Sequence, residues 1–126
     1  MGFILTDLGN EENVLFINFW NWRPTVELIR TFQVIDDARI ELMQVQCVGA
    51  TVGKLEARRI GEMMQTKVLA HVADTARVKL DLAVTDEPDD FTLHRDEQWQ
   101  KNYSATAPWL KRFTHFCLTC EGFKVF

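Results

Sequence analysis

A single long helical pattern, from residue 51 to about residue 73, constrains the fold more than any other feature of this sequence. Apolar residues recur there at the spacing of one helix face, and polar residues fill the opposite face. The expected apolar face consists of Ala57, Ile60, Gly61, Met64, Val68, His71 and Val72. Thr51 is a suitable N-cap, and a helix of about twenty residues spans about 30 Å, the width of a small domain. We therefore expect this helix to cross the fold and to bury one face.

Three segments have the composition of β-strands. Gly2–Asp7 and residues 13–20 flank a turn-rich stretch, so they predict an opening hairpin. The second of these runs is apolar on both faces apart from Asn18, which predicts a central strand covered on both sides. Residues 77–85 alternate apolar and polar side chains, which predicts one strand whose buried face packs against the long helix.

Two shorter helices are predicted before the long one. Pro24 suits a first helical turn, and Val26, Ile29 and Phe32 share one face of a helix that ends near Gln33. Residues 35–47 remain ambiguous, because their first part has the features of a helix start and their second part alternates like a strand. The helix is the favoured interpretation for the start of this segment.

The C-terminal segment predicts a helix followed by a short strand. Thr106 is a candidate N-cap, Pro108 falls in the first turn, and Gly122 is a candidate C-terminal glycine. Residues 123–126 then read as a strand. The order of elements predicts one α+β domain over residues 1–126, a small and mostly antiparallel sheet packed by the long central helix and the C-terminal helix.

Composition narrows the cellular setting. No apolar run approaches the length of a membrane span, and the first residues lack the basic region and cleavage site of an export signal. Three cysteines are an odd number, which is typical of reduced thiols. We therefore expect a cytoplasmic protein that does not bind a membrane. The sequence leaves open whether it forms homo-oligomers.

The net charge of −4 is unevenly distributed along the chain. Residues 81–97 contain seven acidic residues and only one basic residue, Arg95, so this segment carries −6 and the rest of the chain +2. Binding to nucleic acid requires a basic face instead, so we expect no nucleic-acid partner.

Short motifs at both ends resemble those of a group of small bacterial proteins to which no activity is assigned. The motifs are Trp20-Asn21-Trp22-Arg23-Pro24 near the start and Trp109-Leu110-Lys111-Arg112-Phe113, with Phe116 and Cys120-Glu121-Gly122-Phe123, near the end. Glu121 departs from the group's pattern, which has paired glycines at this point. The resemblance implies a bacterial, cytosolic domain and supplies no functional residue.

Two clusters invite a catalytic or metal-binding interpretation. Cys117 and Cys120 form a C-x-x-C pair near a helix C-terminus, where the helix dipole opposes a thiolate. Both cysteines lie on the expected apolar face, whereas His115 points away from it, so we interpret them as core thiols and expect no metal and no cofactor. His71 on the long helix could serve as a general base in a pocket, but no partnered nucleophile is recognisable.

The leading hypothesis is a non-enzymatic protein-binding domain, for example an inhibitor or immunity-type partner of a basic bacterial protein. An exposed acidic loop could steer such a partner, and exposed aromatic side chains beside an arginine have the composition of an interface. The candidate binding residues are Trp22, Arg23, Asp86, Glu87, Asp89, Asp90 and Trp99. Trp20 and Trp109 are expected in the core, whereas Trp22 and Trp99 could be core or surface. The alternative is a small enzyme or ligand-binding protein with a pocket near His71.

Overall fold

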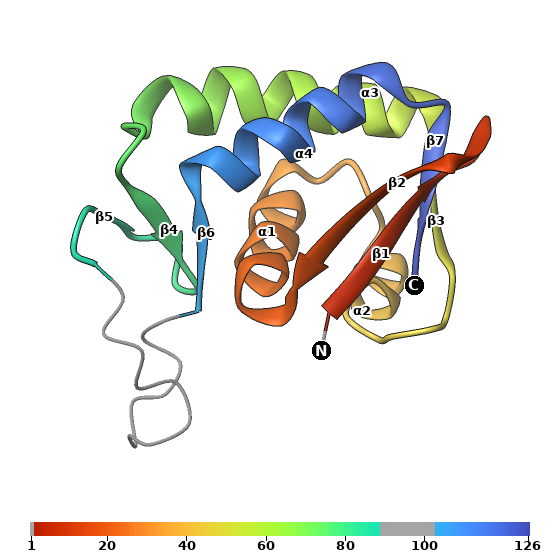
Figure 1. The fold of residues 1–126 in the computed structure, drawn as a ribbon, viewed down its shortest axis with the longest axis horizontal. Coiled ribbons are helices and arrows are strands. Elements are labelled where there is room, and N and C mark those ends of the chain that lie inside the picture. Colours follow the sequence, from red (N-terminus) through yellow and green to blue (C-terminus); the bar gives the residue numbers. More distant parts are fainter. Residues whose placement is uncertain (1, 89–102) are drawn as a thin grey trace.

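The computed structural model describes residues 2–88 and 103–126 (Figure 1). The chain has the predicted α+β fold. Its strands are β1 (Gly2–Asp7), β2 (Asn10–Asn18), β3 (Ala50–Gly53), β4 (Arg77–Lys79), β5 (Val84–Thr85), β6 (Ser104–Thr106) and β7 (Gly122–Val125). Its helices are α1 (Phe19–Phe32), α2 (Asp37–Leu42), α3 (Lys54–Met63), a π-turn η1 (Met64–Val68), a 3₁₀ turn η2 (Leu69–His71) and α4 (Ala107–Thr119). No helix among the described residues is long and apolar enough to cross a membrane.

The strands form two antiparallel sheets. One sheet has the order β2-β1-β7-β3, so the last strand of the chain lies between the first and the third. The other has the order β5-β4-β6. The predicted opening hairpin is confirmed, but β2 is an edge strand and not a central one. Its exposed Phe16 shows that only one of its faces is covered.

The long helix begins later than predicted. Thr51 lies in β3, where it pairs with Lys124, and the helix starts after the N-cap residue Gly53. The Glu56 carboxylate accepts a hydrogen bond of 3.0 Å from the Gly53 N–H, which satisfies a donor at the helix start. The expected apolar face is buried at six of its seven positions, Ala57, Ile60, Gly61, Met64, Val68 and Val72. The seventh, His71, is exposed in η2, so its predicted place on the core face is wrong.

Helix α3 packs beside α4 (Figure 1). The contact is close because Gly61 has no side chain: a β-carbon there would lie 2.8 Å from Leu118 Cδ2. This helix pair replaces the expected packing of the long helix against a strand at residues 77–85.

Residues 77–85 form a tight hairpin and not one strand. The chain reverses between β4 and β5, where the Lys79 N–H donates to the Ala83 carbonyl over 2.8 Å. Leu82 adopts a left-handed conformation with φ of 71° in this turn. Glycine usually occupies such a position, so the turn lacks its customary sequence signal.

Helix α1 begins at Phe19, earlier than Pro24, because the Asn18 side chain accepts a 2.9 Å hydrogen bond from the Asn21 N–H. Trp20 is therefore helical and half-buried, whereas it was expected in the core. The helix ends at Gln33 as predicted. The ambiguous segment resolves as helix α2 with Asp36 as its N-cap, and no strand follows at residues 43–47.

Helix α4 confirms Thr106 as an N-cap. Its C-cap is Cys120, and Gly122 instead opens β7 with φ of 93°. Cys117 and Cys120 are buried free thiols, as expected for core cysteines. Burial raises the pKa of both thiols, which disfavours the reactive thiolate.

An aromatic cluster joins α1, α4 and the large sheet. Its ring centroids lie 6.0 Å apart for Phe3 and Trp22, 5.7 Å for Trp22 and Phe113, and 6.2 Å for Phe113 and Phe123. Trp109 stacks on Phe113 at 5.6 Å and is buried, as predicted. These rings form the centre of the core, on one face of the sheet β2-β1-β7-β3.

Candidate protein-binding surface

The opposite face of the large sheet, here called the outer face, is exposed. In β1 the side chains of Phe3, Leu5 and Asp7 are buried, so those of Ile4 and Thr6 point to the other side. The strand registers place the remaining members of the outer face. They are Val14, Phe16, Thr51, Lys124 and Phe126.

Three apolar side chains form a row across the outer face. Phe16 pairs with Ile4 across the hairpin, and the Phe126 N–H donates to the Ile4 carbonyl over 2.8 Å on the other side of β1. Their exposed fractions are 62% for Phe16, 38% for Ile4 and 39% for Phe126. The next row, which contains Thr6 and Lys124, is mostly polar. An apolar centre with a polar rim is the arrangement found in protein interfaces.

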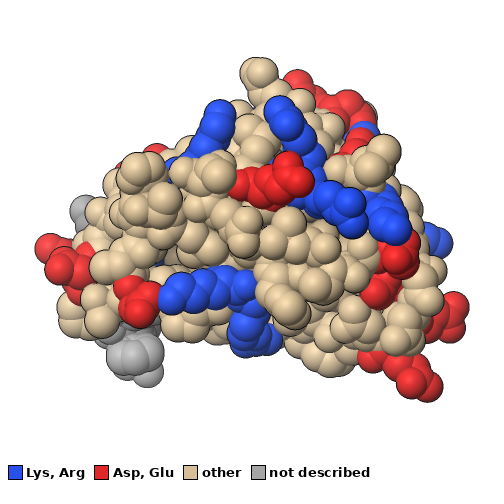
Figure 2. All heavy atoms as spheres, turned by 90° about the horizontal axis from the view of Figure 1, so that it is seen from above, with Lys and Arg blue, Asp and Glu red and all other residues tan. Residues whose placement is uncertain are grey.

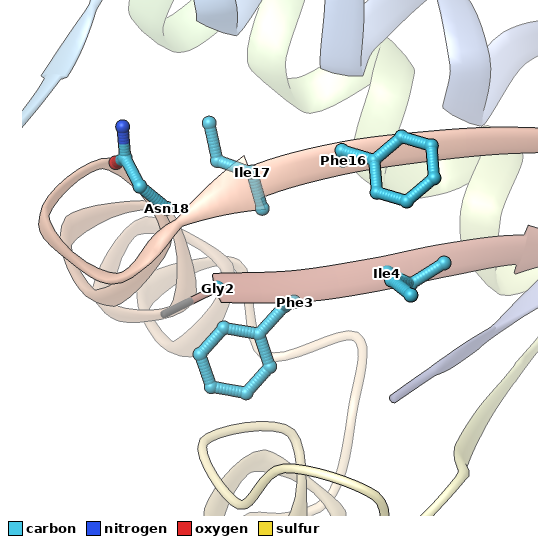
Figure 3. Close-up of a pocket in the computed structure, with 6 residues that line it drawn as sticks. All are labelled: Gly2, Phe3, Ile4, Phe16, Ile17 and Asn18. Carbon is cyan, nitrogen blue, oxygen red and sulfur yellow. The ribbon is translucent and has the colours of Figure 1, made fainter.

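Shallow hollows lie along this row. One of about 430 Å³ is lined by Gly2, Phe3, Ile4, Phe16, Ile17 and Asn18. Figure 3 shows the Ile4 and Phe16 side chains lying together on one face of the hairpin. A second hollow of about 390 Å³ is lined by Thr6, Asp7, Leu8, Glu11, Lys124 and Phe126. The apolar row thus lies between two depressions that a partner's side chains could fill.

The outer edge of β2 presents unpaired backbone groups. The carbonyl of Ile4 accepts from Phe126, so the backbone groups of Ile4 face β7 and not β2. In an antiparallel ladder the residue opposite such a position directs its own N–H and C=O away from the shared hairpin. That residue is Phe16, and Val14 has the same orientation two residues earlier. Since β2 is the edge of its sheet within the described part of the chain, these groups are available to another strand.

A groove separates β2 from α4. It encloses about 620 Å³ and is lined by Asn13, Val14, Leu15, Lys111, Arg112, His115, Phe116 and Thr119. Phe116 is buried and Leu15 half-buried, so they provide apolar surface, while Arg112 and His115 are exposed beside it. The groove therefore joins the free edge of β2 on the side opposite the outer face.

Two basic side chains at this groove, Arg112 and His115, lack an acidic partner among the described residues. Lys111 forms an ion pair with Asp74, whereas Arg112 and His115 form none with the acidic residues that the structure describes. The Arg112 guanidinium carbon lies 5.9 Å from the centroid of the Trp109 ring. Figure 2, which looks down on α3 and α4, shows Lys and Arg side chains in separate groups with acidic side chains next to them. The Lys and Arg residues that line the groove are Lys111 and Arg112, which are neighbours on α4, so the positive charge at the groove is local.

The residues predicted from the sequence are only partly available for binding. Trp22 is completely buried, and its Nε1–H donates to the Met43 carbonyl over 2.8 Å, so this residue belongs to the core and not to a surface site. Arg23 is half-buried, with its guanidinium carbon 5.9 Å from the centroid of the Tyr103 ring. Trp22, for which the sequence left core and surface open, is thus a core residue and does not form a binding site with Arg23 at the surface.

The acidic loop is described only at its start. Asp86 and Glu87 are exposed, and the Glu87 carbonyl accepts a 2.9 Å hydrogen bond from Arg77 Nε. Asp89, Asp90 and Trp99 lie outside the described residues. The structure thus places two of the four predicted acidic residues at the surface.

The enzyme or ligand-binding alternative requires a pocket near His71. This residue is exposed at the end of the long helix and lines none of the three depressions described above. Within residues 2–88 and 103–126, no group of three or more His, Cys, Asp or Glu side chains is arranged to hold a metal ion. The predicted catalytic pocket gains no support from this geometry.

Sequence reasoning missed the outer face and the groove. The relevant signal is the apolar character of both faces of β2, which from the sequence alone predicts a strand covered on both sides. Comparison of the chain with protein-family models, curated proteins and solved structures finds no match. The functional inference therefore depends on the surface of this chain alone.

Proposed function

We propose that this chain is a non-enzymatic protein-binding domain whose partner docks on the outer face. The observation that carries the proposal is the exposed row of Phe16, Ile4 and Phe126 across adjacent strands. Contiguous apolar surface of this kind is costly to leave in water and commonly marks an interaction site. The row is flanked by depressions and by polar side chains, which suits a specific contact.

The test replaces Phe16 with serine. Affinity capture from the source cells with the wild-type domain would supply a candidate partner, and titration of that purified partner would give its dissociation constant. Phe16→Ser should weaken binding at least about tenfold, because central aromatic side chains dominate interface energies. The free energy of unfolding of the Phe16→Ser variant should change little, since Phe16 is the most exposed side chain of the row.

The matched control is Leu55→Ser. Leu55 is 79% exposed on α3, so this change also removes a large apolar side chain from the surface, but on a different element. It should leave affinity for the purified partner unchanged. Equal losses with both variants, or a loss with Leu55→Ser alone, would contradict docking on the outer face.

The acidic segment supports a narrower form of the proposal, in which the partner is a basic bacterial protein that this domain inhibits. Asp81, Asp86 and Glu87 are all exposed, and charge steering by such residues accelerates association with a basic surface. Neutralising these three residues should slow association with the purified partner at low salt and reduce its salt dependence. An unchanged rate would contradict steering while leaving the docking proposal intact.

A further inference from the structure

We infer that a partner's extended segment adds to β2 as a further antiparallel strand, with carboxylates directed into the α4 groove and apolar side chains extending the outer face. This inference rests on the proposed protein-binding function and specifies the chemistry of the one partner segment that docks on β2. It combines the free backbone edge, the apolar row and the hydrogen-bond donors of Arg112 and His115 at the groove.

The backbone geometry supplies the first requirement. Val14 and Phe16 direct N–H and C=O groups away from β1, as deduced from the Phe126-to-Ile4 hydrogen bond. An added strand would pair with these groups, as in other cases of recognition by strand addition. The regular ladder of β2 with β1 runs from Val14 to Asn18, before which the register shifts, so this edge offers the N–H and C=O groups of Val14 and Phe16 to an added strand.

The alternation of side chains fixes the partner's sequence pattern. Partner residues directly opposite Val14 and Phe16 would place their side chains on the outer face, where they extend the apolar row. The residues between them would point to the groove side, together with Asn13 and Leu15. The segment should therefore alternate apolar residues with residues suited to the groove.

Charge identifies the residues suited to the groove. Arg112 and His115 stand at its rim without an acidic partner among the described residues. Carboxylates on the added strand would meet these donors, and hydrogen bonds between a guanidinium and a carboxylate are among the stronger ones. A second copy of this chain fits less well, because Asn13, Leu15 and Ile17, which alternate with Val14 and Phe16 along β2, carry no carboxylate.

The experiment uses a synthetic peptide, Glu-Val-Glu-Ile-Glu-Val-Glu with blocked ends, titrated into the full chain by fluorescence anisotropy. We expect saturable binding that weakens as salt is raised. A peptide with lysine in place of glutamate, and one of the same composition without the alternation, should not bind. Binding of all three peptides alike would overturn the inference.

Backbone pairing is tested by N-methylation. The valine and isoleucine amides of the peptide are those that would face β2, so methylating them should abolish binding. Methylating glutamate amides, which would face away, should not. In the protein, Val14→Pro removes an outward N–H without removing a bond to β1, so it should prevent peptide binding while the fold is kept. If Val14→Pro fails to fold, the methylated peptides still decide the question.

The groove is tested by Arg112→Glu, with Arg58→Glu on α3 as the control of equal charge change. The first should weaken peptide binding at least about tenfold, as expected when a charge pair is reversed, and the second should have little effect. Equal effects would show that only net charge matters and would contradict the groove. If concentration-dependent dimers form through β2, the edge is occupied by a second copy and the inference fails.

The outcomes separate this inference from the proposed function. If Phe16→Ser no longer binds the captured partner and the wild type does not bind the peptide, docking on the outer face is retained and strand addition is rejected. If Phe16→Ser changes the affinity for neither the peptide nor the captured partner, docking on the outer face is rejected. Strand addition at the β2 edge and the groove would then be retained.

Discussion

Buried polar side chains at a few positions hold the core in one arrangement. Thr25 is completely buried between α1 and α4, where its hydroxyl donates to the Asn21 carbonyl and accepts from Trp109 Nε1–H, both over 2.8 Å. Every fully buried side-chain N or O atom among the described residues has a hydrogen-bond partner. A satisfied polar group stabilises modestly, but an orphaned one is costly.

Thr25→Val should therefore lower the free energy of unfolding by about 1–3 kcal/mol, because it leaves the indole N–H of Trp109 without an acceptor. Urea denaturation followed by circular dichroism measures the change. In the double variant with Trp109→Phe, the loss should be smaller than the sum of the two single losses, since both hydrogen-bonding partners are then removed. Additive losses would mean that this hydrogen bond contributes nothing of its own.

Asp7 is a buried carboxylate near the β1–β2 turn. Burial by itself would raise its pKa, but hydrogen bonds from Asn13 Nδ2, the Glu121 N–H and the Gly9 N–H, at 2.9 to 3.0 Å, lower the pKa below its ordinary value. A depressed pKa in the folded state contributes stability above the unfolded pKa, and this contribution is lost as the pH falls through the folded value.

The wild type should lose stability as the pH falls from neutral to below about pH 4. Asp7→Asn should lose less stability over the same pH range, because it lacks the carboxylate that is protonated there. Thermal unfolding at a series of pH values measures this difference. Asp36→Asn is the comparison variant. Hydrogen bonds from Arg39 also lower the pKa of this carboxylate, but Asp36 is exposed to solvent, so its substitution should change the pH dependence less than Asp7→Asn does. If Asp7→Asn shows the same acid-dependent loss as the wild type, the buried carboxylate does not contribute to the pH dependence.

At the scale of elements, local signals predicted the structure wherever the cause of an element is local. Thr106 starts its helix as expected, and Asp36 caps a helix in the segment whose start was predicted to be helical, since capping depends on residues three positions apart. Residues 77–85 were misinterpreted because Leu82 adopts a conformation typical of glycine. The N-terminus of the long helix was misplaced because β7 recruits Thr51 into the sheet.

The candidate site depends on non-local strand pairing, so the sequence predicted only part of it. The apolar residues of β2 are visible in the sequence, but whether they are buried depends on which strands flank them. β7, the last strand of the chain, pairs with β1 and leaves β2 at the edge. No local pattern encodes that choice, so neither Phe16 nor the groove beside Arg112 could be assigned to a surface from the sequence.

The turn from α4 into β7 requires glycine at position 122. Its φ is 93°, and a β-carbon there would lie 2.6 Å from the Val52 carbonyl oxygen. Gly122→Ala should therefore destabilise the fold by more than about 1 kcal/mol, since the backbone of β3 must shift as well. Gly53→Ser is the control, because its φ is −72° and a β-carbon there meets only Glu56 at 3.4 Å. Chemical denaturation should show Gly53→Ser near wild type or slightly stabilised, as expected for serine at an N-cap.

On the scale of the whole molecule, one helix pair joins two sheets of unequal size. α4 begins after β6 of the small sheet and ends before β7 of the large one. The Thr106 N–H donates to Asn21 Oδ1 over 3.0 Å, which ties β6 to α1. The large sheet buries its inner face against the aromatic cluster, whereas β4 and β5 pair at only two positions and Val84 is exposed. Stability should therefore be unevenly distributed between the two sheets.

Native-state hydrogen exchange should detect this difference. The Lys79 amide, which donates to Ala83 in the β4–β5 hairpin, should exchange through local opening, because few buried apolar contacts hold β5. The amides of β1 and β7 that lie within the ladder should exchange only through global unfolding, since those strands pair on both sides and cover the core. Exchange measured by NMR at increasing low concentrations of denaturant separates the two processes, because only global opening accelerates strongly with denaturant. The same steep dependence for Lys79 as for the β1 amides would show that the hairpin unfolds with the whole molecule, and the predicted hierarchy would then be wrong.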